Sequence, residues 1–139
     1  MSYRVSAALQ AAVYRKLRDD AELAALVGDA VFDALPIAPP GGVHIAIGPE
    51  EVSGTADSSG TVSRHDFTVS VLAGRDAATG FDAVKRAAMA VSAALEDADL
   101  AMERGRLAGL WFLKARATRV EHSAERRVDL TFRALVDLI

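Results

Sequence analysis

The chain has 139 residues, no cysteine and a formal net charge of −3 at pH 7. This length predicts one domain, 1–139, and the lack of cysteine excludes disulfides, thiolate nucleophiles and zinc–cysteine sites. The acidic balance argues against a strongly basic nucleic-acid-binding protein, and no apolar run approaches the roughly 20 residues of a membrane-spanning helix.

Two helices are predicted at the start of the chain. The apolar residues of the first recur every four positions and form one stripe: Val5, Leu9, Val13 and Leu17. The segment DDAELAALVG then starts a second helix. Asp19 is the expected cap of this helix, with Glu22 three residues later as in a capping box, and Gly28 is the expected C-terminal stop.

Three strands are predicted next. AVFDALP (30–36) indicates a short strand that ends at Pro36, and VHIAIG (43–48) indicates a second strand that Pro49 closes. RHDFTVSVLAG (64–74) gives a clear alternation with one buried face.

One more helix and two strands complete the pattern. An alanine-rich helix is expected within 76–100, capped by Asp76 or Thr79. Strands follow within 107–122 and 126–139, joined by a hairpin loop. The order α-α-β-β-β-α-β-β predicts an α+β fold in which two main helices pack on one face of an antiparallel sheet.

The search for catalytic chemistry finds no motif. The three histidines, His44, His65 and His122, have no partners at metal-ligand spacing. His65 and Asp66 are neighbours in a predicted strand, so their side chains are expected to diverge. No glycine-rich segment has the spacing of a phosphate loop. We therefore expect no enzymatic activity, no metal and no cofactor.

Charge and aromatic residues are unevenly distributed. Residues 1–100 contain 8 Lys/Arg and 14 Asp/Glu, a net of −6, whereas residues 101–139 contain 8 and 5, a net of +3. This asymmetry is either ordinary surface scatter or a pair of complementary surfaces that meet in an oligomer. Trp111 and Phe112 make both faces of one strand apolar, which indicates either a covered sheet or a subunit contact. The arginines of this region lack the interleaved aromatic residues of a nucleic-acid stacking platform.

The order of these segments resembles the bacteriophage tail terminator family, also called tail completion proteins, including those of gene transfer agents. The resemblance is carried by LQAAVYRKLRDDAELAALVGDAVFDALP (9–36), VHIAIG, HDFTVSVLAG, the helix end VSAAL and the terminal FRALVDLI. It covers nearly the whole chain.

The resemblance implies a structural virion protein. Such proteins form a homo-oligomeric, hexameric ring on the head-proximal end of the tail tube, where the ring stops tube polymerisation and meets the head–tail connector or neck protein. DNA passes through the ring without sequence-specific binding. The implied location is the virion, with assembly in the host cytoplasm and no membrane contact.

Two groups of residues follow as site hypotheses. The polar segment PEEVSGTADSSGTVSR (49–64) is either a solvent-exposed linker or, as the resemblance implies, a loop that contacts the tail tube protein. Its proposed contact residues are Glu50, Glu51, Gly54, Asp57, Ser58, Ser59, Gly60 and Arg64. Since ring subunits meet head to tail, the terminal hairpin is the expected subunit interface, with Trp111, Arg116, Arg119, Arg126 and Arg127.

Two alternatives remain open from the sequence. The first is a head–tail connector of the same particle, because connectors are also small α+β ring proteins. The second is a small-ligand binding module or enzyme, which requires a concave apolar cavity with convergent polar groups.

Overall fold

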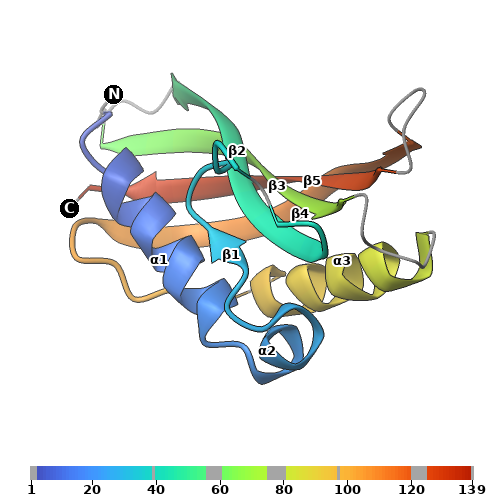
Figure 1. The fold of residues 1–139 in the computed structure, drawn as a ribbon. Coiled ribbons are helices and arrows are strands. Elements are labelled where there is room, and N and C mark those ends of the chain that lie inside the picture. Colours follow the sequence, from blue (N-terminus) through green and yellow to red (C-terminus); the bar gives the residue numbers. More distant parts are fainter. Residues whose placement is uncertain are drawn as a thin grey trace.

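The computed structural model describes residues 3–38, 40–55, 61–74, 81–96, 98–119 and 125–138. In these ranges α1 (Ser6–Arg18), α2 (Ala21–Val27) and α3 (Phe81–Leu95) pack against one face of a five-stranded sheet (Figure 1). Within the described part of the chain, each helix is too short or too polar to cross a membrane.

The sheet has the strand order β1-β2-β3-β5-β4. Its strands are β1 (Val31–Phe32), β2 (Val43–Gly54), β3 (Val62–Ala73), β4 (Arg106–Arg119) and β5 (Arg126–Asp137). All neighbours are antiparallel except β1, which pairs in parallel with β2. The predicted α+β class and element order are confirmed. The topology places β1 and β4 at opposite edges of the sheet.

The two N-terminal helices form as their patterns predict, with one correction at their junction. The N-cap of α2 is Asp20 rather than Asp19, because Asp20 Oδ2 accepts a hydrogen bond of 3.0 Å from the Leu23 N–H. The N–H of Asp19 bonds to the Arg15 carbonyl, so Asp19 still belongs to the end of α1. Gly28 ends α2 as expected, with a φ of 63° that favours glycine.

Strand β1 is shorter than the sequence indicates. Val31 and Phe32 pair with Ile45 and Ala46 of β2, and the chain leaves the sheet directly afterwards. The segment that follows, up to residue 38, runs over the surface.

Strand β2 is longer than predicted, because Pro49 does not close it. The strand continues to Gly54 across a register shift between Ile47 and Glu50. A bulge of this kind accommodates a proline, which has no N–H to donate to the ladder. Most of the polar segment 49–64 is therefore strand, and only residues 55–61 connect β2 to β3.

The bulge also changes which side chains of β2 face the helices. Strict alternation from Ile47 would place Glu51 on the core face. The register shift instead sets Glu50 opposite Phe67, whose side chain is buried in the core. A carboxylate thus points toward the helices, a consequence that period-two alternation alone does not predict.

The hydrophobic core lies between the helices and one face of β3 and β5. Phe132 at the middle of β5 is fully buried and stacks on Phe67 of β3, with ring centroids 5.8 Å apart. The alternation predicted for β5 is confirmed, since every second residue is buried: Val128, Leu130, Phe132, Ala134 and Val136.

The opposite face of the sheet is polar. Arg133 of β5 donates two hydrogen bonds to Asp66 of β3, from Nε at 2.8 Å and from a terminal nitrogen at 3.0 Å. The hydrogen bonds from Arg133 lower the pKa of the Asp66 carboxyl. Both side chains remain partly exposed, so water screens this pair and it contributes little to stability. The face is solvated around this pair, whereas His44, Ala46 and Ser70 on the same face are buried nearer to β1.

We expect Phe132→Ala to lower the free energy of unfolding by about 3 to 5 kcal/mol, because it leaves a cavity at the centre of the core. Phe112→Ala is the matched control. Its ring contacts Phe132 edge-on at 5.9 Å but is 39% exposed, so a loss below about 2 kcal/mol is expected. Urea denaturation followed by circular dichroism measures both. Equal losses would contradict this description of the core.

Candidate functional site

A buried polar cluster joins the N-terminus of α1 to β2 and β3. Ser63 Oγ lies 2.8 Å from His65 Nε2, and the Ser6 hydroxyl donates a 2.6 Å hydrogen bond to Glu50 Oε1. His65 Nδ1 lies 3.5 Å from Glu50 Oε2 and makes no hydrogen bond. Burial lowers the pKa of His65, and the Glu50 carboxylate offsets only part of this effect. His65 is therefore neutral at pH 7.

The order serine, histidine, carboxylate is that of a hydrolase triad, but this cluster is enclosed. The side chain of His65 is fully buried and Ser63 is 1% exposed. The cavity beside Glu50 measures about 10 Å³, which is barely room for one water molecule. A substrate has no access to Ser63, so the cluster serves packing. The predicted divergence of His65 and Asp66 is confirmed, since Asp66 pairs with Arg133 on the other face.

The other histidines form no metal site in the described residues. His44 is buried, with Nδ1 3.0 Å from the Gly42 carbonyl, and His122 lies outside the described residues. Across the described ranges, no group of three potential metal ligands comes together.

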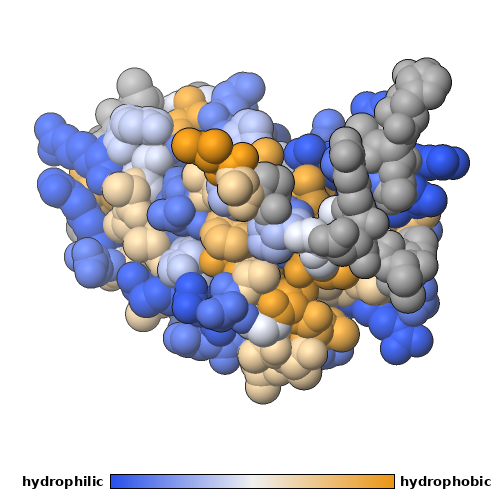
Figure 2. All heavy atoms as spheres, viewed as in Figure 1, coloured by the Kyte–Doolittle hydropathy of each residue, from blue (hydrophilic) through white to orange (hydrophobic). Residues whose placement is uncertain are grey.

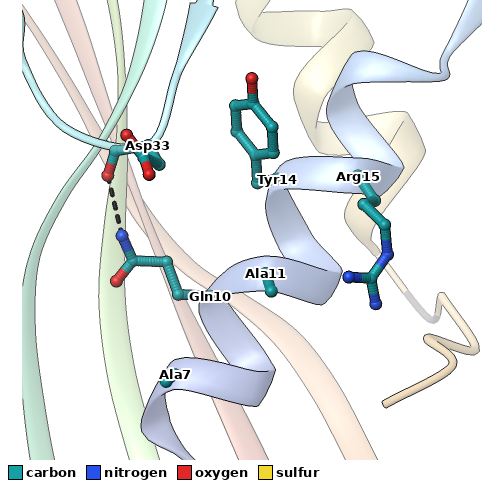
Figure 3. A pocket seen from close by; sticks show the side chains of 6 residues that line it. All are labelled: Ala7, Gln10, Ala11, Tyr14, Arg15 and Asp33. Atoms are coloured by element: carbon teal, nitrogen blue, oxygen red, sulfur yellow. Dashed lines mark hydrogen bonds between the residues drawn. The ribbon is translucent and has the colours of Figure 1, made fainter. Parts of the chain in front are cut away.

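The small-ligand alternative requires a cavity in which polar groups converge. A shallow hollow of about 390 Å³ lies on the outer side of α1 (Figure 3). Gln10 points across it and donates a 2.9 Å hydrogen bond to the Asp33 carbonyl, whereas Arg15 is directed away to the other side of the helix. Arg15 bonds to the Ala101 carbonyl at 3.2 Å, and the Tyr14 hydroxyl accepts a bond from Arg18 at 2.7 Å. These polar groups serve other partners and do not converge on a ligand.

The residues predicted for tube contact are separated by the structure. Glu50 faces the interior, while Glu51 and Gly54 are exposed on β2. Arg64 is exposed on β3 and donates a 3.2 Å hydrogen bond to the Ser53 hydroxyl of β2. The remaining four lie outside the described residues: Asp57, Ser58, Ser59 and Gly60.

The edge strand β4 is exposed on both sides of the sheet from Trp111 to Ala117. Trp111, Phe112 and Leu113 are 44%, 39% and 42% exposed, so the expectation that protein covers both faces is wrong for this chain alone. The uncovered strand edge also carries backbone groups that can pair with another strand.

A bulge in β4 distributes the predicted interface residues over both faces. The register shifts between Phe112 and Lys114, so Ala115 and Ala117 join Phe112 on the helix side. Trp111 and Arg116 face the open side, opposite Arg133 and Asp129.

The other three predicted interface arginines are likewise divided. Arg127 lies on the open side and forms an ion pair with Asp129 at 3.0 Å. Arg119 pairs with Arg126 in the ladder, and the Arg126 guanidinium lies 5.6 Å from the Phe81 ring centre. The five residues therefore do not form one patch.

The sequence interpretation missed two apolar surface features. One is the exposed pair Leu35 and Ile37 after β1; the other is a groove between α3 and β4 with Met89 on its rim. The signal for the first was present in the sequence, because Ile37 lies between prolines where no strand or helix can bury it. The groove depends on the distance between α3 and β4, which no local pattern encodes.

The stability of the protein is expected to fall as the pH drops from about 6.5, the value for an unfolded histidine, toward the lowered pKa of His65. In this window the unfolded chain binds more protons than the folded one, so acid favours unfolding. His65→Gln should flatten this part of the profile. Asp66→Asn is the control, because the hydrogen bonds from Arg133 lower the pKa of its carboxyl further below this window. Denaturation between pH 4.5 and 7.5 measures the effect, and identical slopes with and without His65 would contradict it.

Comparison with known proteins identifies the family to which the chain belongs. The family model described as tail completion protein gp17 matches residues 11–137. A solved chain described as part of the virion of a native gene transfer agent particle is 56% identical, with a TM-score of 0.88, over 98% of this chain and 99% of that one. Another solved chain shares the fold at 16% identity, with a TM-score of 0.67 over 96% of each chain. No curated protein matches significantly. The chain belongs to the tail completion protein gp17 family.

Proposed function

We propose that this protein is a structural, non-enzymatic component of a phage-like particle that forms a hexameric ring on the head-proximal end of the tail tube. The observation that carries the proposal is the 56% identity, over nearly both full chains, with a component of a native gene transfer agent virion. The family match to tail completion proteins supports the same position in the particle.

The exposed edge of the sheet supports a ring. Subunits of a closed ring meet head to tail, so each presents two different surfaces to its two neighbours. Strand β4 provides one such surface, because its backbone edge is unpaired in the sheet order and Trp111 and Phe112 lie exposed on its two faces. The interface residues predicted from the sequence contribute from both faces of β4 and of its neighbour β5.

The β2–β3 hairpin supports a contact with the tail tube. The hairpin extends beyond α1 near the N-terminus, away from α3 (Figure 1). Glu51 and Arg64 are exposed on it, so the proposed tube contact consists of these residues and the connection 55–61. Glu50 is left out of the contact because it faces His65 in the interior.

The charge of the chain suits a conduit for DNA. A net charge of −3 disfavours tight binding to the phosphate backbone, so DNA passes through the ring without being retained. The opposite end of the ring meets the neck protein of the filled head.

Particles produced without this protein should have overlong tails or tails without heads, because nothing would end tube polymerisation or connect the tube to the head. Electron microscopy of such particles measures tail length and head attachment, with the wild-type chain supplied in trans as the control. Normal, full particles would contradict the proposal. Tails of normal length that lack heads would favour a connector over a terminator.

Deletion of residues 54–60 is expected to leave the fold intact and to abolish tail capping. The fold should survive because the deletion removes only the last pair of the β2–β3 ladder, Gly54 with Ser63, and Ser63 still pairs with Val136 of β5. A control variant replaces residues 54–60 with a Gly/Ser segment of the same length. It distinguishes the effect of the loop's side chains from the effect of its length. Circular dichroism reports folding and electron microscopy reports capping. Full capping by the deletion variant would show that the segment is only a linker.

A further inference from the structure

The segment after β1 exposes two large apolar side chains. Leu35 is 56% exposed and Ile37 is exposed as fully as in an extended peptide. Figure 2 shows hydrophobic surface over the connection between β1 and β2, on the face where α1 and β1 lie in front. We call Leu35 and Ile37 the apolar tip. Because two nearby apolar side chains that touch so little of their own chain gain free energy when they are covered, the tip is suited to a partner.

A groove of about 390 Å³ lies between α3 and the edge strand β4. It exists because α3 packs over β3 and β5, and the sheet extends one strand further. We call it the α3–β4 groove. It is mainly apolar, and its lining comprises Lys85, Ala88, Met89, Ser92, Phe112, Ala115, Ala117, Val128 and Leu130. Met89 is 70% exposed on its rim.

The apolar tip and the α3–β4 groove lie at opposite edges of the molecule. The tip follows β1, and the groove ends at β4, with three strands between them in the sheet order. At the usual strand spacing of about 4.8 Å, the two edges are roughly 19 Å apart. One chain cannot insert its own tip into its own groove, but successive copies can do so head to tail.

The charges around the two features are complementary. Asp29 and Asp33 are exposed beside the tip, and residues 29–38 contain no Lys or Arg. Lys85 lines the groove, and Arg119 of β4 and Arg126 of β5 lie on the same side of the sheet. The other basic residues of β4 face the open side, and Glu96, which accepts a hydrogen bond from the lining residue Ser92, is the acidic residue at the far end of the groove. This arrangement attracts the tip of another copy toward the groove and disfavours contact between two grooves.

We propose that the apolar tip of each subunit inserts into the α3–β4 groove of the next copy of this chain. The inference rests on the proposed ring and assigns its contact: Leu35 and Ile37 against Met89, Phe112 and the alanines of β4. It places the principal contact on the helix side of β4, whereas Trp111 lies on the open side.

Cross-linking tests the contact directly, because the wild-type chain has no cysteine. A variant with both Ile37→Cys and Met89→Cys changes two exposed side chains, so it should fold. In rings or particles, a short bis-maleimide, which tolerates more varied geometry than a disulfide, should join these subunits into a covalent ladder. The matched control pairs Met89→Cys with Thr131→Cys on the open face and should give no ladder.

The outcomes separate this inference from the proposed function. Rings that form in electron micrographs but give no ladder overturn the tip-in-groove contact and leave the ring intact. A cross-link that joins the thiol introduced by Met89→Cys to a tube or neck protein instead also overturns it. Particles that never contain a ring of this chain overturn the proposed function itself.

A charge exchange provides a second readout. Asp33→Lys and Lys85→Glu should each weaken ring assembly roughly threefold, as expected for a partly exposed ion pair, and the double variant should recover most of the loss. Ring yield measured by native mass spectrometry reports this coupling. Losses that simply add in the double variant would count against the contact.

Discussion

Strand β5 pairs along its length with β3 on one side and β4 on the other, and both the core and the exposed edge depend on this position. Its alternate side chains, centred on Phe132, are buried in the core, where α3 packs on the strand. Its other side chains, such as Arg133 and Asp129, form ion pairs or hydrogen bonds across the open face. The helices cover one face of the sheet only, so the fold has two layers, and α3 covers the edge strand β4 only in part.

The incomplete coverage of the edge strand β4 by the helices connects the fold to the proposed function. A monomer with a long, uncovered edge strand is prone to uncontrolled strand pairing, and exposed aromatic residues on that strand increase the tendency. In a ring the same edge is covered by a neighbour, so the exposed surface becomes specific contact area. The bulge in β4 divides this surface, with Trp111 and Lys114 on the open side and Ala115 on the groove side.

The buried cluster around His65 belongs to the stability of the subunit rather than to chemistry. Ser6 at the start of α1 bonds to Glu50, which the β2 bulge turns inward, and His65 lies beside that carboxylate. The cluster fixes the first turn of α1 against the base of the β2–β3 hairpin. A rigid base of this kind suits a hairpin that is proposed to contact the tail tube.

The sequence itself determined much of the fold, because the spacing of apolar residues and the residues that end helices and strands are local properties. The four-residue stripe from Val5 to Leu17, the stop at Gly28 and the alternation of β5 predicted the elements and their order. Only the tertiary structure decided which side chains share a face, because the bulges at Pro49 and Leu113 shift the alternation by one residue. Strict alternation along each strand therefore did not predict that Glu50 faces the core. It also did not predict that Trp111 and Ala115 lie on opposite faces of β4. The groove between α3 and β4 was likewise beyond the sequence, since it arises from the number of strands that the helices cover.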